Sequence, residues 1–216
     1  MKRTLAAVAI GVACLLAAAV DVRAEDESTR EWRFPIHVSY VDGFSDVGDY
    51  YEDLLGFDTT LIPVGVAFSP YLEFDYSAAT GSAVGMQIGP TEFIYWEVTN
   101  YGVGGSSSTD NGSYVAFPLI LYYGQVFVPK KSVSPYVKIG YSFPVAFGDE
   151  VGDTTGGLFA AIGMEFMRKK IVGLGFEFAI DESKVTFDPT FGVFGNVVPA
   201  QEVKPFGFTA SFKIVF

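Results

Sequence analysis

The chemistry that the sequence could support centres on its single histidine. His37 stands two residues before Ser39 and five residues before Asp42. Histidine, serine and aspartate are the residue types of nucleophilic hydrolysis, in which an imidazole activates a hydroxyl and a carboxylate orients the imidazole. In an extended segment His37 and Ser39 lie on one face, because side chains alternate along a strand. The simpler interpretation is a polar residue on an enclosed face, so we expect no enzyme activity and no catalytic residue.

Acidic residues concentrate in one segment, and their spacing bears on metal binding. The segment contains Asp42, Asp46, Asp49, Glu52, Asp53 and Asp58. It lacks the alternating ligands and the glycine of an EF-hand loop, so the sequence assigns no metal site and no cofactor. A solvated rim is the simpler interpretation. The alternative hypothesis is that divalent cations bridge these carboxylates to anionic surface glycolipid, since calcium and magnesium prefer oxygen ligands.

The N-terminus has the pattern of a secretory signal peptide. Lys2 and Arg3 precede an apolar run over residues 5–20, and cleavage is predicted after Ala24. The run is shorter than the roughly 20 residues that span a bilayer comfortably. The one cysteine, Cys14, lies inside this segment, so the mature chain is expected to have no disulfide. We therefore expect a signal peptide over 1–24 and one domain over 25–216.

The chain is apolar for a soluble domain. Half of the 216 residues are hydrophobic, and the mean hydropathy is +0.32, yet after residue 24 no apolar run approaches the roughly 18 residues of a spanning helix. Only helices and closed β-barrels span membranes, because hydrocarbon cannot satisfy free backbone groups. Apolar and polar residues alternate between turn residues, which predicts strands. We expect an all-β fold, a transmembrane antiparallel up-and-down β-barrel, with a soluble secreted β-sandwich as the alternative.

Ten strands are favoured, an even number as in bacterial barrels, and eight is the alternative if residues 80–112 form one loop. The predicted strands are 31–41, 60–68, 71–79, 83–88, 92–101, 113–128, 135–147, 158–167, 171–181 and 204–216. Short turns predicted on the periplasmic side are 69–70, 89–91, 129–134 and 168–170. Longer loops predicted on the outside include 42–58, 102–112, 148–157 and 182–203. The short connection at 80–82 breaks this alternation, and a single helical turn is predicted within 49–56.

Parity sorts each strand into two faces. The outward rows are apolar: Trp32, Phe34, Ile36, Val38 and Tyr40; Val137, Ile139, Tyr141, Phe143 and Val145; Val172, Leu174, Phe176, Phe178 and Ile180. The inward rows are small or charged. Their charged and polar members are Arg33, His37, Glu73, Asp75, Lys138, Glu165, Glu177 and Lys213. Opposite charges in one enclosed space can pair, so we expect a plugged lumen rather than an open pore.

The end of the chain carries the most specific motif. Alternating Phe208, Ala210, Phe212 and Ile214 lead to a terminal Phe216. In this pattern the chain resembles the small outer-membrane β-barrel proteins of bacteria with two membranes. The resemblance implies that Phe208, Phe212, Ile214 and Phe216 form the signal read by the barrel assembly machinery, and that the barrel contacts outer-membrane lipid and lipopolysaccharide.

The expected function is that of a non-enzymatic, monomeric outer-membrane barrel, with a structural, adhesive or receptor-like role through its external loops. A narrow channel for ions or small solutes is the alternative. A soluble β-sandwich binding protein is third, and a lipid-modifying barrel enzyme is fourth. The formal net charge of −11 argues against nucleic acid as a partner.

Overall fold

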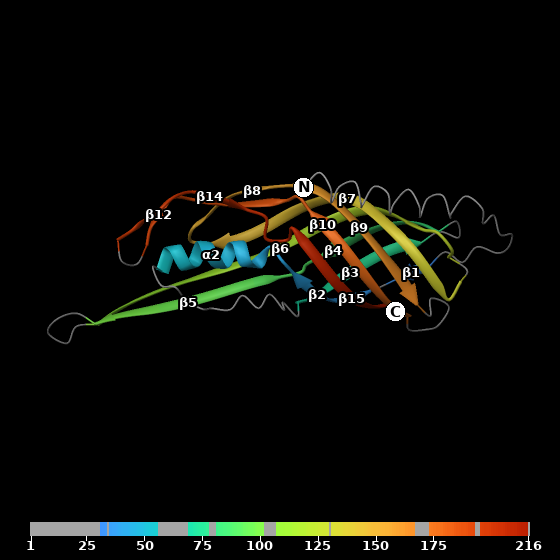
Figure 1. Cartoon of the computed structure of the whole chain (residues 1–216), viewed down its shortest axis with the longest axis horizontal. Coiled ribbons are helices and arrows are strands. Elements are labelled where there is room, and N and C mark those ends of the chain that lie inside the picture. The colour runs from blue at the N-terminus through green and yellow to red at the C-terminus, as the bar shows by residue number, and fades with distance from the viewer. Residues whose placement is uncertain are drawn as a thin grey trace.

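A computed structural model describes residues 31–33, 35–55, 69–77, 81–101, 107–129, 131–166, 173–192 and 195–215. Within these ranges the chain is an antiparallel β protein with a single helix (Figure 1). No helix in the described part of the chain is long and apolar enough to cross a bilayer. The predicted signal peptide, 1–24, lies outside the described residues.

Eight strands pair in a closed ring. They are β2 (Ile36–Val41), β3 (Ser69–Ser77), β4 (Ser82–Ile88), β6 (Ser107–Val126), β7 (Val133–Gly148), β9 (Gly157–Phe166), β10 (Gly173–Asp181) and β15 (Phe208–Val215). Each pairs antiparallel with the next in this order, β15 pairs with β2, and the ring is thereby closed. The predicted antiparallel up-and-down β-barrel is confirmed.

Two further strands join the sheet outside this ring. The sheet therefore has ten strands, of which eight form the closed barrel. Among the described residues, β1 (Glu31–Arg33) pairs only with β3, and β5 (Glu92–Tyr101) pairs only with β6. The ring has eight strands, but the reason given for that alternative was wrong, because 80–112 contains β4, β5 and the start of β6 rather than one loop. The predicted strand 60–68 lies outside the described residues.

Strands β4 and β5 follow one another along the same edge of the long strand β6. β4 pairs with residues 119–125 of β6 and β5 pairs with residues 107–116. Gly89, whose φ of 100° favours glycine, lies between the two strands. The predicted short turn at 89–91 was therefore wrong, because the chain there continues in the same direction. The predicted loop 102–112 was wrong over 107–112, which belongs to β6.

The predicted turns at one end need a second correction. Residues 69 and 70, predicted as a turn, are paired with residues 39 and 38 inside the ring. The short connection predicted at 80–82 does join β3 to β4, although residue 80 lies outside the described residues and Ser82 is already the first residue of β4. The strand ends that the short connections join therefore lie at one end of the ring: Ser77 and Ser82, Val126 and Val133, and Phe166 and Gly173.

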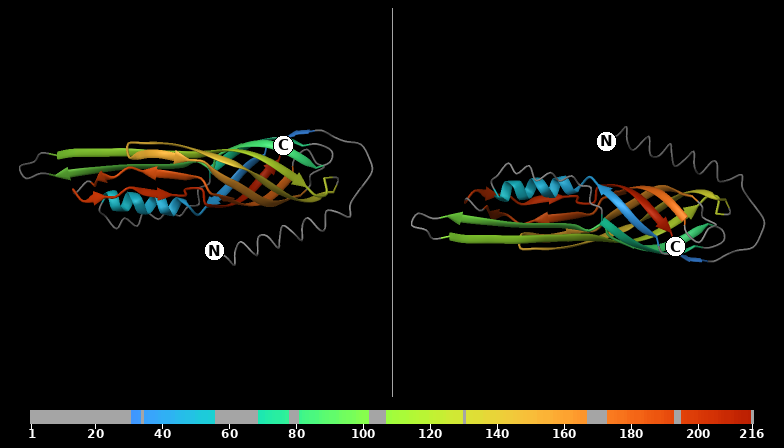
Figure 2. Two further views of the ribbon diagram at one scale, coloured as in Figure 1. Left: turned by 90° about the horizontal axis from the view of Figure 1, so that it is seen from above. Right: turned by 90° about the horizontal axis from the view of Figure 1, so that it is seen from below.

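The long connections at the other end are folded (Figure 2). They form α2 (Phe44–Leu55), β8 (Val151–Thr155), β11 (Lys184–Phe187), β12 (Thr190–Phe191), β13 (Val197–Val198) and β14 (Gln201–Val203). β14, β11 and β8 make a three-stranded sheet, and β12 pairs with β13. We call α2, β8 and β11–β14 the cap. We call β5, residues 107–116 of β6 and residues 143–148 of β7 the wall, because they continue beyond the ring.

The outer face of the ring is apolar, as parity predicted. Side chains exposed on this face include Ile36, Val38 and Tyr40 on β2, Ile139, Tyr141 and Phe143 on β7, and Phe176, Phe178 and Ile180 on β10. The side chains of Trp32, Phe34 and Val172 lie outside the described part. On β6, whose parity the sequence left open, Leu121 and Tyr123 point outward and Ile120 and Tyr122 are buried.

Candidate functional site

The lumen of the ring contains two buried ion pairs. Lys138 Nζ lies 2.6 Å from Glu177 Oε2, and Lys213 Nζ lies 2.8 Å from Glu165 Oε1. All four side chains are almost completely buried. A lone charge here would be costly, and the pairing offsets that cost. The structure thus brings together four of the residues that parity placed inside.

Tyr136 connects the two pairs. Its hydroxyl donates to Glu177 Oε2 at 2.9 Å, and Lys213 Nζ lies 4.0 Å from the centre of its ring. Lys138 Nζ is 4.6 Å from the ring centre of Tyr122 on the neighbouring strand. Cations over aromatic faces are stabilised by the ring quadrupole. Tyrosine rings and ion pairs together therefore fill this section of the lumen.

Inward glycines provide the room for these large side chains. A Cβ added at Gly163 would overlap the ring of Tyr136, and one added at Gly175 would lie 2.9 Å from Lys213 Cε. Near the short-turn end, Tyr122, Tyr136 and Lys138 border a cavity of about 10 Å³, which is room for about one water molecule. Side chains therefore occupy this section of the described lumen and leave room for little more than one water molecule.

The remaining predicted lumen residues are placed unequally. His37 is buried and stands opposite Lys213 and Tyr71 in the strand register. Ser39 Oγ shares a hydrogen bond of 2.9 Å with Ser211 Oγ, while Asp42 is exposed and accepts from the Tyr40 hydroxyl at 3.3 Å. His37 and Ser39 thus share the inward face of β2, whereas Asp42 is exposed at its end, so the structure does not bring the three residues together. Arg33, Glu73 and Asp75 lie on β1 and β3, where the side chains are not described.

The C-terminal strand shows the predicted outward pattern in part. Phe208 and Phe212 are exposed on the outer face of β15, and Ile214 is half-buried. Phe216 lies outside the described residues. Recognition of these residues by an assembly machinery stays a prediction.

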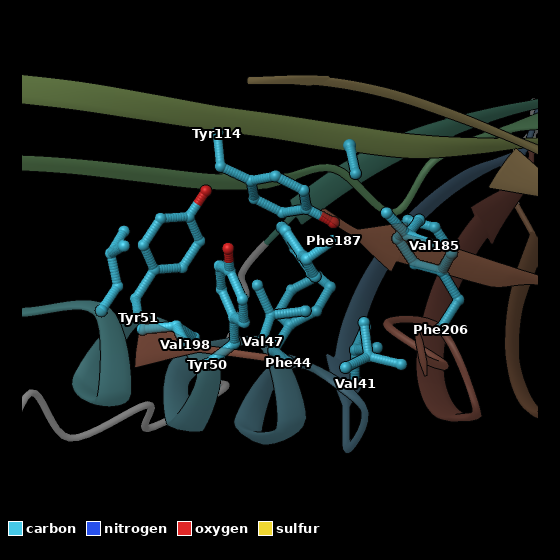
Figure 3. Packing of buried hydrophobic residues seen from close by; sticks show 13 residues of the cluster. Val41, Phe44, Val47, Tyr50, Tyr51, Tyr114, Val185, Phe187, Val198 and Phe206 are labelled. Carbon is cyan, nitrogen blue, oxygen red and sulfur yellow. The ribbon is translucent and has the colours of Figure 1, made fainter. Parts of the chain in front are cut away.

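The cap has a hydrophobic core of its own (Figure 3). Tyr50 of α2 stacks on Phe187 of β11 with ring centres 4.1 Å apart. Tyr51 of α2 and Tyr114 of the wall lie 6.0 Å apart and both contact Phe187. Helix, sheet and wall therefore form one packed unit above the ring.

The sequence contains a signal for this core that the prediction of a single turn missed. Phe44, Val47, Tyr51 and Leu54 recur at helical spacing and are all buried. Val185 and Phe187 alternate on β11 and are fully buried, within a segment predicted to be a loop. Their periodicity predicts a helix and a strand, each with one buried face.

The opposite face of α2 is acidic. Asp46, Asp49 and Asp53 are exposed along it. Partial burial, and then the nearby carboxylates of Asp49 and Asp42, raise the pKa of Asp46. In the described ranges no three or more histidine, cysteine or acidic side chains are grouped closely enough to hold a metal ion. A cation bridge to glycolipid, which would supply further ligands, stays a prediction.

The ring, its outer face and its interior together define the class of protein. Hydrocarbon admits closed barrels whose outward residues are apolar and whose inward residues are polar. The described barrel has an apolar outer face, and its interior contains the two ion pairs together with a small hydrophobic cluster of Ile120, Tyr122, Phe159, Ala161 and Ala179. Its short and long connections lie at opposite ends, as in outer-membrane barrels. The chain is a β-barrel of the outer-membrane type.

Comparisons with solved structures find similar architectures. The structure is similar to Neisserial surface protein A at 10% identity and a TM-score of 0.40, covering 88% of this chain and 98% of that one. It is similar to the outer membrane protein OprG from Pseudomonas aeruginosa at 12% identity and a TM-score of 0.42, covering 88% of this chain and 94% of that one. It is also similar to Ail, the attachment invasion locus protein of Yersinia pestis, at 11% identity and a TM-score of 0.39, covering 89% of this chain and 100% of that one.

These identities and TM-scores are too low to assign the chain to a family or to transfer a role. The sequence matches no protein-family model, and no curated protein matches it significantly.

Proposed function

We propose that this protein is a non-enzymatic outer-membrane barrel whose cap contacts a partner at the cell surface, in an adhesive or receptor-like role. The observation that carries this proposal is the hydrophobic core of the cap, in which Tyr50, Tyr114 and Phe187 join three separate connections. Loops that pack on one another present a fixed surface, which lowers the entropic cost of binding. A purely structural barrel has no need of such a unit.

The charge of the cap indicates the kind of partner. The segments 42–68, 89–118 and 149–156 contain no lysine or arginine, and 182–207 contains only Lys184 and Lys204. Both lysines form ion pairs, with Glu202 and Glu182 respectively. An anionic surface steers cationic groups toward it and repels anions. The proposal therefore favours a partner that presents basic groups.

Attachment of intact cells tests this role. Bacteria that display the full chain are expected to bind a surface coated with a basic protein several-fold better than cells without it. Asp46→Asn with Asp49→Asn is expected to remove most of this gain, since these carboxylates lie on the exposed face of α2. Glu97→Gln with Asp153→Asn makes the same change in charge elsewhere and is the matched control. Equal attachment by all three proteins would refute a binding role for this face.

A narrow channel is the second candidate, and the filled lumen opposes it. In planar bilayers the wild-type protein is expected to give no conductance steps, because Tyr136 and the two ion pairs occupy the lumen. Tyr136→Ala removes the connecting ring and is expected to produce small, brief steps. Tyr141→Ala truncates an outward tyrosine on the same strand and is the control. Steady conductance by the wild-type protein would favour the channel.

We also expect the outer face to contact lipid and lipopolysaccharide, and the C-terminal strand to be recognised by the barrel assembly machinery. Apolar outward rows suit acyl chains. A monomer is sufficient for this function, since the ring closes within one chain.

A further inference from the structure

Glu92 is a buried acid at the place where the cap meets the wall. It is the first residue of β5, level with Ala116 of β6 and so beyond the ring. The residue is only 4% exposed, and its carboxyl lies close enough to Tyr51 of α2 to raise the pKa of that tyrosine. Among the described residues its Oε2 atom has no hydrogen-bond partner. A carboxylate in this position has lost its hydration, and this Oε2 atom gains no hydrogen bond in return, which is energetically unfavourable.

Among the described residues, the titratable groups that interact with Glu92 are tyrosines: Tyr114 of β6 lies beside its carboxyl, and Tyr51 comes from α2. Further acids lie near Tyr50 and Tyr51 of α2: Asp149 and Glu150 from the connection between β7 and β8, and Asp188 after β11. Tyr51 Oη and Glu150 Oε2 also lack hydrogen-bond partners in the described part. The two lysines of the cap pair with other acids. We call Glu92, Tyr114, Tyr51 and Glu150 the acidic cluster.

This setting favours the neutral carboxyl. Burial raises the pKa of Glu92 well above its ordinary value of 4.5, and the neighbouring Tyr114 hydroxyl lowers it in part. Burial, together with the nearby carboxylate of Asp149, also raises the pKa of Glu150. Ionisation would place negative charge in a low-dielectric space without a cation to balance it.

We propose that the acidic cluster is a pH-sensitive clasp, which holds the cap against the wall while Glu92 is protonated and loosens the cap when Glu92 ionises. The direction of the pH dependence follows from the difference between the folded and unfolded pKa of Glu92. Because the pKa in the folded cap lies above the unfolded value, the clasp contributes its full stabilisation at a pH below the unfolded pKa. Its contribution is lost as the pH rises toward the folded pKa. The cap is therefore tight in acidic surroundings and looser in alkaline ones.

Hydrogen–deuterium exchange of the full chain in lipid vesicles tests the clasp. Protection factors, corrected for the intrinsic effect of pH on exchange, are measured for α2 at pH 5, 7 and 9, with β9 in the ring as internal reference. In the wild-type protein α2 is expected to lose about tenfold or more of its protection between pH 5 and pH 9, since one unit of pKa shift corresponds to tenfold. The protection of β9 is expected to stay constant.

Three variants separate the clasp from general charge repulsion. Glu92→Gln is expected to keep α2 protection nearly constant with pH, while Asp153→Asn, which removes an exposed charge of the cap, keeps the wild-type loss. Tyr114→Phe removes the hydroxyl that lowers the pKa of Glu92 in the folded cap, so the loss is expected to extend to higher pH and to become larger. The clasp is refuted if wild-type α2 protection does not change with pH, or if Glu92→Gln loses as much protection as the wild type.

Discussion

Replacing Lys213 with methionine is expected to lower the free energy of unfolding by about 3–5 kcal/mol, the usual result of breaking a buried ion pair. Methionine has nearly the length of lysine but leaves the Glu165 carboxylate without the ammonium that lies 2.8 Å away. It also removes the cation from the ring of Tyr136, which connects the second pair. Urea unfolding in lipid vesicles, followed by tryptophan fluorescence, measures the change.

Two further variants show whether burial causes the loss. Lys184→Met breaks an ion pair whose side chains are 34% and 54% exposed, and exposed pairs contribute only about 0–1 kcal/mol. The double variant Lys213→Met with Glu165→Met removes both charges and is expected to recover most of the stability, because a matched apolar pair often replaces a buried ion pair at little cost. A loss in Lys184→Met equal to that in Lys213→Met would contradict this account of the lumen.

Phe187→Ala is expected to unfold the cap and leave the barrel intact. Phe187 is fully buried and contacts Tyr50, Tyr51 and Tyr114, so its truncation removes the ring on which the core is built. Truncating a buried phenylalanine to alanine costs about 3–5 kcal/mol, which is large for a unit as small as the cap. Limited proteolysis should then cut within α2, while the heat-modifiable mobility of the folded barrel on gels is unchanged.

The matched control is Phe191→Ala, four residues along the same connection. Phe191 is 75% exposed on β12, so truncation leaves no cavity, and α2 should stay resistant to protease. If Phe187→Ala also abolished the mobility shift of the barrel, the cap and the ring would form a single cooperative unit, contrary to the independent core described above.

Strict alternation made the ring predictable from the sequence. Rows such as Phe176, Phe178 and Ile180 have an unbroken period of two, and their inward neighbours are small or charged, so parity fixed both faces. The ion pairs could be anticipated as a group, because lysines and glutamates share the inward parity. Which lysine meets which glutamate depends on strand stagger, and that is set by pairings between distant segments.

The strands and the helix beyond the ring were not predicted, because the local composition of these segments is typical of loops. Residues 107–112 have the serine, asparagine and glycine content of a loop, yet they pair with β5 across the hairpin. The glycine and proline at 89–91 do interrupt a strand, because Gly89 has a positive φ. They do not reverse the chain, since β4 and β5 both pair antiparallel with β6. For α2, the apolar residues have helical spacing in the sequence. The sequence did not show the surface of β11 and the wall on which that helical face packs.

The core of the cap also contains residues from three of the long connections of the ring. Phe44 comes from the first long connection, Tyr114 from the second, and Phe187 and Phe206 from the last, and all four share one core. The last connection leads into β15, which closes the ring between β10 and β2. We therefore expect the core of the cap to be complete only in chains whose final strand has closed the cylinder.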